Sequence, residues 1–159
     1  MYLNHTLKKL KNCFLRSGNG FTLLEVLLSF AVIAMLAAFS IPIYQSFQVK
    51  NDFDVTVNST VQTLRRAQVL SQAVDGDTSW GVKLQSGSMV LFKGVSYASR
   101  DATYDEIFDV PTSITASGVT EVVYAKFTGL PVTTGNITLT SVNGDTKNIV
   151  INAKGMINY

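Results

Sequence analysis

The sequence has 159 residues, of which 47% are hydrophobic and 15% are charged, and its formal net charge is +2. This length is enough for one domain with a modest core, and the near-neutral charge gives no indication of a general nucleic-acid partner. The first twenty residues hold four cations and no acid, so the rest of the chain has a formal net charge of −2. These cations are Lys8, Lys9, Lys11 and Arg16.

The sequence contains one cysteine, Cys13, which excludes an intramolecular disulfide. Cys13 precedes the first apolar segment instead of following it, and this position argues against a lipoprotein anchor. The fold must therefore be held by packing and hydrogen bonds alone.

Residues 1–20 form a short basic leader that ends in Ser-Gly-Asn-Gly, a flexible sequence typical of a protease-accessible segment. Residues 21–43 form an almost unbroken apolar segment, in which Glu25 is the only charged residue. About 20 apolar residues in a helix cross the hydrocarbon core of a bilayer, so we expect a transmembrane helix. By the positive-inside rule, the leader lies in the cytoplasm and the body lies outside.

The helix is expected to continue as an amphipathic segment over residues 44–76, because apolar residues recur there at helical spacing. Pro42 should bend it where it leaves the apolar segment, and Asp75-Gly76-Asp77 should end it with turn chemistry. The expected apolar face holds Val49, Phe53, Val57, Val61, Leu64, Ala67 and Val74, and the expected polar face holds Lys50, Asp52, Asn58, Gln62, Arg65 and Arg66.

Residues 77–159 are predicted to form a β-rich domain. Its two clearest hairpins join residues 80–84 to 89–93, and residues 137–142 to 147–152 through an Asn-Gly turn. The predicted fold class is α+β: one long N-terminal α-helix, with a transmembrane half and an amphipathic half, packed on an antiparallel β-sheet. We further expect a loop at 94–105, strands at 107–110, around 114 and at 121–127, and a last turn and edge strand at 155–159.

The segment with the clearest functional meaning is residues 20–26, Gly-Phe-Thr-Leu-Leu-Glu-Val. Gly20 lets a peptidase approach the backbone closely. A carboxylate such as that of Glu25 is costly inside an apolar span and needs a partner. Cleavage before Phe21 would free an amine about one helical turn from Glu25. This amine and the carboxylate could neutralise each other, within one chain or between neighbours, and so set the register of stacked helices.

This segment resembles the cleavage and N-methylation motif of type IV prepilins and type II secretion pseudopilins. The resemblance implies that a prepilin peptidase and methyltransferase cuts after Gly20 and methylates the new N-terminal Phe21. It also implies that Glu25 supports assembly and that Pro42 is a helix-kinking proline. The close resemblance covers residues 17–48; the β-rich domain is more loosely similar to minor pseudopilins and lacks the C-terminal disulfide of many pilins.

The function implied is that of a structural filament subunit, with copies of itself, other pilins and an inner-membrane platform protein as partners. Before assembly the protein would lie in the inner membrane, in contact with lipid. We expect no enzymatic activity, cofactor or metal, and nucleic acid is an unlikely partner. The alternative is a membrane-anchored surface protein, an adhesin or DNA receptor, that does not polymerise. A conventional signal peptide fits less well because its apolar core would be only about 7–15 residues long.

Several weaker patterns have an ordinary structural interpretation. Asp75-Gly76-Asp77 and the acids at residues 101–109 could ligate calcium, but a turn and a solvated loop explain them as well. The pair at 65–66 could contact DNA, but two adjacent arginines are more often solvated charge. The tripeptides at 58–60 and 136–138 match glycosylation sequons, which are frequent by chance. The aromatic residues expected in the core between helix and sheet are Phe47, Phe53, Trp80, Phe92 and Tyr124.

Overall fold

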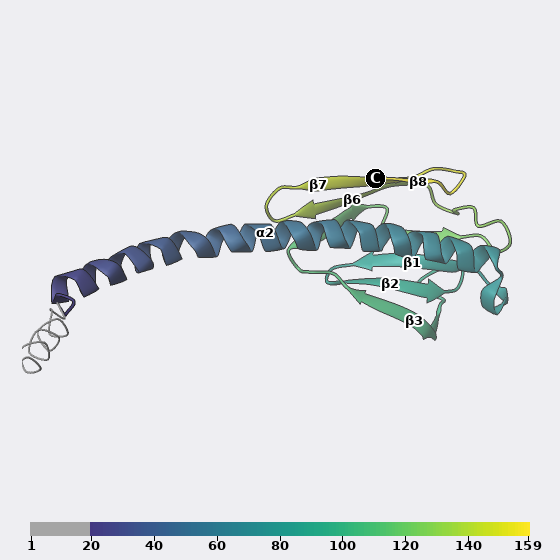
Figure 1. Cartoon of the computed structure of the whole chain (residues 1–159). Coiled ribbons are helices and arrows are strands. Elements are labelled where there is room, and N and C mark those ends of the chain that lie inside the picture. Colours follow the sequence, from purple (N-terminus) through teal and green to yellow (C-terminus); the bar gives the residue numbers. More distant parts are fainter. Residues whose placement is uncertain (1–19) are drawn as a thin grey trace, which may run out of the picture. The chain divides into compact units, whose positions relative to one another are not determined.

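The structure is a computed structural model that describes residues 20–159, apart from the side chains of residues 40–42. The described residues divide into two compact units, with the boundary between Pro42 and Ile43. One helix, α2, runs over Leu23–Gln72 and belongs to both units (Figure 1). The helix ends at Gln72, before the predicted end, and Val74, which was expected on its apolar face, has a left-handed backbone with φ 57°. A short 3₁₀ turn, η1, forms the predicted turn at Asp75–Asp77. The predicted leader, apart from Gly20, lies outside the described residues.

Eight strands in the second unit form two antiparallel sheets. The first sheet has the order β3-β2-β1-β5 and the second has the order β4-β6-β7-β8. The α+β class and the long helix are confirmed, but the helix packs against two sheets instead of the single sheet that was expected. The strands of the first sheet are β1 (Trp80–Gln85), β2 (Ser88–Lys93), β3 (Asp101–Asp109) and β5 (Glu121–Tyr124), and those of the second are β4 (Ile114–Gly118), β6 (Gly135–Ser141), β7 (Thr146–Ile151) and β8 (Ile157–Asn158).

Both predicted hairpins are confirmed by the strand pairing. β1 pairs with β2 from Trp80 opposite Lys93 to Gln85 opposite Ser88. β6 pairs with β7, and Gly144 with positive φ lies in the turn between them. Such a backbone conformation costs glycine little, which explains the Asn-Gly signal. The short edge strand β8, paired with β7, confirms the prediction for the C-terminal residues.

The loop predicted at residues 94–105 is wrong at its C-terminal end, because β3 already begins at Asp101. β3 is an edge strand, and its first four side chains are exposed. Its pairing with β2 is irregular: Leu91 lies opposite Glu106, whereas Lys93 lies opposite Asp101. A polar, bulged edge strand has no alternating apolar pattern, so its sequence was indistinguishable from that of a loop.

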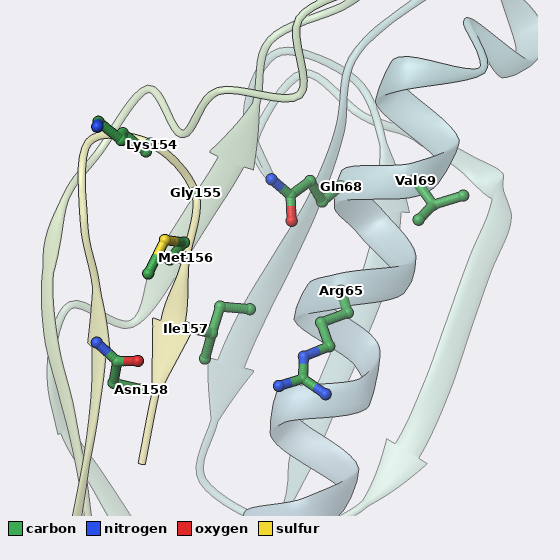
Figure 2. A pocket seen from close by; sticks show the side chains of 8 residues that line it. All are labelled: Arg65, Gln68, Val69, Lys154, Gly155, Met156, Ile157 and Asn158. Carbon is green, nitrogen blue, oxygen red and sulfur yellow. The ribbon is translucent and has the colours of Figure 1, made fainter.

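The turn before β8 lies beside the C-terminal part of α2 (Figure 2). Gly155 has φ 76° and is buried, and a Cβ atom there would come within 2.3 Å of Nε2 of Gln68. The same nitrogen donates a hydrogen bond of 3.1 Å to the carbonyl oxygen of Gly129. The positive φ favours glycine at position 155, and a larger residue there would also displace the amide end of the Gln68 side chain. This packing fixes the C-terminal turn against the helix.

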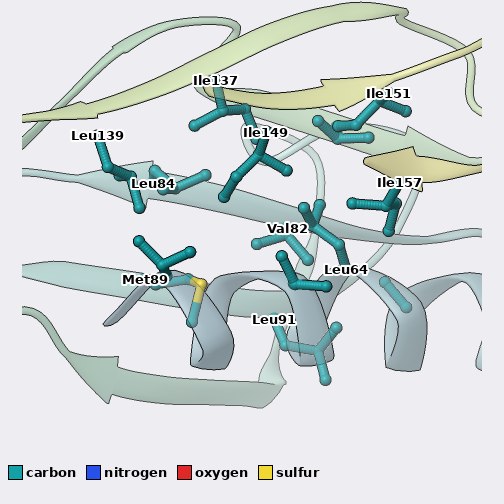
Figure 3. Close-up of a cluster of buried hydrophobic side chains, with 14 of the residues drawn as sticks. Leu64, Val82, Leu84, Met89, Leu91, Ile137, Leu139, Ile149, Ile151 and Ile157 are labelled. Carbon is teal, nitrogen blue, oxygen red and sulfur yellow. The ribbon is translucent and has the colours of Figure 1, made fainter. Parts of the chain in front are cut away.

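The core lies where the apolar stripe of α2 meets the inner faces of both sheets (Figure 3). Leu64 of α2 is fully buried among side chains from both sheets. Phe53, Trp80 and Tyr124 are buried in this core as predicted. Phe92 is also buried, but the prediction that it lies between helix and sheet is wrong, because it packs in a separate cluster with Val90 and Val123. Neighbouring residues of a strand face opposite sides of the sheet. The prediction for Phe47 is wrong, since its side chain is 69% exposed. Among the residues of α2 with described side chains, the first buried one is Phe53, so Phe47 comes before the part of the helix that the sheets cover.

Candidate functional site at the start of the apolar helix

The start of α2 is held by a side-chain cap. Gly20, Phe21 and Thr22 precede the first helical residue, Leu23. Oγ1 of Thr22 accepts a hydrogen bond of 3.2 Å from the backbone N–H of Glu25, and the carbonyl oxygen of Thr22 accepts one of 3.1 Å from Val26. Thr22 is therefore the N-cap, and Glu25 occupies the third helical position, as in a capping box.

Gly20, the predicted cleavage residue, lies in open space. A Cβ atom added there would meet nothing within 4 Å, and its φ lies outside the left-handed region that favours glycine. Neither sterics nor backbone conformation within the described residues therefore requires glycine at this position. Phe21, the predicted new N-terminal residue, is 80% exposed. Within the described residues, no other part of the chain covers Gly20 or Phe21.

Glu25 lies in the first turn of α2, where the helix dipole favours negative charge. Its side chain is exposed and makes no ion pair within residues 20–159. One turn later, Oγ of Ser29 donates a hydrogen bond of 2.8 Å to the carbonyl oxygen of Glu25. If the bond before Phe21 were cut, the new ammonium group would add positive charge at the positive end of the dipole. Glu25 is the carboxylate placed to offset it.

The rest of this helical segment is apolar on every side. Every described side chain from Leu23 to Phe39 is exposed. By length and composition, α2 is long and apolar enough to cross a membrane. A helix that is apolar all round requires an apolar environment, either lipid or other protein. A shallow groove of about 260 Å³ runs along it, lined by Phe21, Val26, Ser29, Phe30 and Ile33.

Pro42 lies inside the helical range of α2, at the boundary between the two units. Its side chain lies outside the described residues, and the bend predicted there stays a prediction.

Several of the weaker candidates have local partners in the structure, whereas Arg65 and Asp109 form no ion pair within residues 20–159. Asp77 forms an ion pair with Lys126, whose hydrogen bond and charge lower the pKa of the Asp77 carboxyl. Asp105 pairs with Arg100, and Glu106 accepts two hydrogen bonds from Arg66. The acids at residues 101–109 lie on strand β3, and not in the solvated loop that was expected. Within residues 20–159, His, Cys, Asp and Glu form no group of three or more that could hold a metal ion.

The hydroxyl groups of both sequon tripeptides are already engaged. Thr60 is buried, and its hydroxyl donates to the carbonyl oxygen of Thr56. Thr138 donates a hydrogen bond of 2.7 Å to Oδ1 of Asn148. Chance matching is therefore a simpler interpretation of these tripeptides than glycosylation.

The cap residue Thr22 and its supporting contact were not predicted from the sequence. Phe21 and Val26 line the same groove, in the positions of a hydrophobic staple on either side of the cap. The signal was present as Thr-x-x-Glu preceded by a large apolar residue. This pattern was interpreted as a processing motif, and the helix cap that it also encodes was not predicted.

Comparison with known proteins gives one match. The family model for the prokaryotic N-terminal methylation motif matches residues 15–41, which include Gly20, Phe21 and Glu25. Neither the curated proteins nor the solved structures gave a match to the chain. The chain therefore carries the prepilin-type cleavage and methylation signature, which indicates a precursor of the type IV pilin or pseudopilin kind.

Proposed function

We propose that this protein is a structural subunit of a type IV pilus or type II secretion pseudopilus, and not an enzyme. A prepilin peptidase would cleave it after Gly20, and Phe21 would become the N-methylated first residue. The observation that carries the proposal is the apolar surface of residues 23–39, which no described part of the chain covers and which begins with one carboxylate.

The accessible Gly20–Phe21 bond supports the processing step. Because a side chain at position 20 would meet nothing among residues 21–159, a requirement for glycine would come from the peptidase that approaches the backbone. The basic leader would keep this bond on the cytoplasmic side of the inner membrane. The body would lie outside, and the subunit would be surrounded by lipid before assembly.

The charge at the start of α2 supports the assembly step. A carboxylate in an apolar environment needs a partner of opposite charge, and the ammonium group of Phe21 from a neighbouring copy is a suitable one. Pairing between copies would fix their axial register, because every other residue around this part of the helix is uncharged. Lipid and helix surfaces are similarly apolar, so the helices gain little by leaving the membrane. A platform protein in the inner membrane would supply the directed step.

The first experiment is mass spectrometry of the protein extracted from the membranes of cells that contain the peptidase. We expect a mature chain that begins with N-methylated Phe21. An intact chain beginning at Met1 would contradict the proposal and favour a membrane-anchored adhesin or receptor that does not polymerise. A chain beginning near residue 40 would indicate a secreted protein with an ordinary signal peptide.

The second experiment replaces Glu25 by Gln, which keeps the shape of the side chain and removes the charge. We expect normal membrane insertion and cleavage, but at least about a tenfold loss of filament, since about 1.4 kcal/mol of lost pairing energy per contact already changes an equilibrium tenfold. Ser29→Ala, one turn further along the same helix, is the control and should assemble normally. Wild-type filament yield from Glu25→Gln would exclude the proposed role of the carboxylate.

A further inference from the structure

A basic hollow lies on one flank of α2. It has a volume of about 470 Å³ and is formed by the helix, the C-terminal turn and β8 (Figure 2). Two cations line it, Arg65 from α2 and Lys154 from the turn, and no acid does. Val69 and Met156, which are 60% and 56% exposed, give it an apolar rim.

An acidic hollow lies on the other flank of the same helix. It has a volume of about 160 Å³ and is formed by α2, β2 and the end of β3. Asp52 of α2 and Asp109 of β3 line it, and no cation does. Val55, which is 59% exposed, and Val110 supply apolar surface. Each hollow therefore combines two charges of one sign with apolar surface, and the two hollows differ in the sign of that charge.

The four charges in these hollows have no partner within residues 20–159. Four other cations of the body form ion pairs, namely Arg66 with Glu106, Lys83 with Glu121, Arg100 with Asp105 and Lys126 with Asp77. The contrast is clearest on the helix, where Arg66 is held by two hydrogen bonds to Glu106 and the adjacent Arg65 makes none. Arg65, Lys154, Asp52 and Asp109 form no ion pair in the described part of the chain.

The two hollows cannot both face the same neighbour. Asp52 and Arg65 are thirteen residues apart on α2, which corresponds to about 20 Å along the helix axis and about 140° around it. The basic hollow lies against β8 of one sheet, and the acidic hollow lies against β2 and β3 of the other. One partner could cover either hollow but not both, so each copy has room for two different neighbours.

We propose that the basic hollow of one copy binds the acidic hollow of the next copy of this chain. The contact would join Arg65 and Lys154 to Asp52 and Asp109, with Val69 and Met156 packed against Val55 and Val110. An interface between two different surfaces that is also displaced along an axis does not close, and it generates an open helical array. The inference rests on the proposed function, and it adds a second, body-to-body contact to the assembly through the apolar helix.

The charge test exchanges one residue on each surface in the full-length chain, expressed with its peptidase and assembly machinery. Arg65→Glu and Asp52→Lys should each reduce filament yield about tenfold or more, since each places like charges opposite one another. The double variant, which has the wild-type net charge, should recover to within about threefold of the wild type. Lys147→Glu and Asp145→Lys, exposed positions that line neither hollow, are matched controls and should assemble normally.

The geometry test uses cysteines and a short bismaleimide cross-linker. Cys13 precedes the cleavage site, so the mature chain would contain no native cysteine. A chain with both Val55→Cys and Met156→Cys should give a ladder of covalent oligomers, and either single variant alone should give none. A mixture of the two single variants should give dimers only. Dimers without a ladder from the double variant would overturn the open-chain arrangement.

The outcomes separate this inference from the proposed function. If wild-type protein is cleaved and forms filaments, but Arg65→Glu, Asp52→Lys and their controls all assemble equally, the body contact is excluded and the proposed function stands. If wild-type protein is neither cleaved nor assembled, the proposed function fails and the inference fails with it. An unchanged unfolding transition of Trp80 fluorescence in each variant ensures that a loss of filament does not reflect misfolding.

Discussion

The two halves of α2 have the same secondary structure and opposite environments. From Leu23 to Phe39, every described side chain is exposed, including large ones such as Leu28 at 66%. From Phe53 to Ser71, one broad face is buried, with Val61 and Leu64 almost completely inaccessible. The second half is covered by two sheets of its own chain. The first half has no such cover within the described residues.

This difference shows where each half must obtain its stability. Isolated helices are marginal in water, and most helices in proteins are stabilised by packing of an apolar face. The second half gains this packing when the body folds. The first half is apolar on all sides, so it needs lipid or other copies around it. The folding of one half and the assembly of the other are therefore separate events that can be perturbed separately.

The largest expected effect comes from truncating one leucine in each half. Leu64→Ala should destabilise the body by about 2–5 kcal/mol, because it leaves a cavity in the core shared by helix and sheets. Leu28→Ala should change the free energy of unfolding of the body by less than about 0.5 kcal/mol. Chemical unfolding of the full chain in detergent, followed by Trp80 fluorescence, measures both values. Equal destabilisation by the two variants would show that the halves do not behave independently.

The second effect is an alkaline loss of stability confined to the body. Tyr124 is fully buried, and its hydroxyl group has no hydrogen-bond partner in the described chain. Burial disfavours the charged phenolate and raises the pKa of Tyr124 from 10.0 to about 12. Below pH 10, Tyr124 is neutral in both the folded and the unfolded state, so the shift does not change the free energy of unfolding. Between pH 10 and 12 only the unfolded state ionises, so stability falls as the pH rises. The loss approaches roughly 2–3 kcal/mol once the pH exceeds 12.

Tyr124→Phe isolates this effect, because it removes the titrating hydroxyl and keeps the ring. At neutral pH the variant should be within about 1 kcal/mol of the wild type or more stable, since an unpartnered buried hydroxyl is lost. Between pH 10 and 12 its free energy of unfolding should fall less steeply than that of the wild type. Parallel pH profiles for the two proteins would exclude Tyr124 as the source.

Much of this arrangement follows from sequence patterns that have a direct physical cause. The apolar segment, the turn at Asp75–Asp77 and both hairpins were predicted because one local feature determines each of them. The Asn-Gly turn after β6 is an example, since few other residues adopt its backbone conformation. The positions of Gly20, Phe21 and Glu25 relative to the start of α2 could also be predicted, because they are close to it in sequence. Their roles in cleavage and assembly stay predictions.

The remaining features depend on contacts between segments distant in sequence. Thr56 and Thr60 are buried in α2 because their hydroxyls donate to carbonyl oxygens one turn earlier, at 2.8 Å each. Such threonines count as polar in a hydrophobic pattern, so the buried face looked narrower than it is. A broad face can contact two sheets, and the second sheet was accordingly missed. The two charged hollows also need the folded chain, because Lys154 and Asp109 lie far in sequence from Arg65 and Asp52.

The smallest expected effect lies at the very start of the exposed half. Thr22→Ala removes the side-chain acceptor that the N–H of Glu25 uses, which should cost about 1 kcal/mol of local helix stability. In detergent micelles, the amide of Glu25 should then exchange its hydrogen about five to ten times faster, whereas the amide of Leu64 in the core should not change. Thr22→Ser keeps an acceptor oxygen and should exchange almost like the wild type. If Thr22→Ala left the exchange of Glu25 unchanged, the cap would not be what holds the first turn, and the placement of the Glu25 carboxylate would depend on the surrounding lipid or a neighbouring copy instead of on the chain itself.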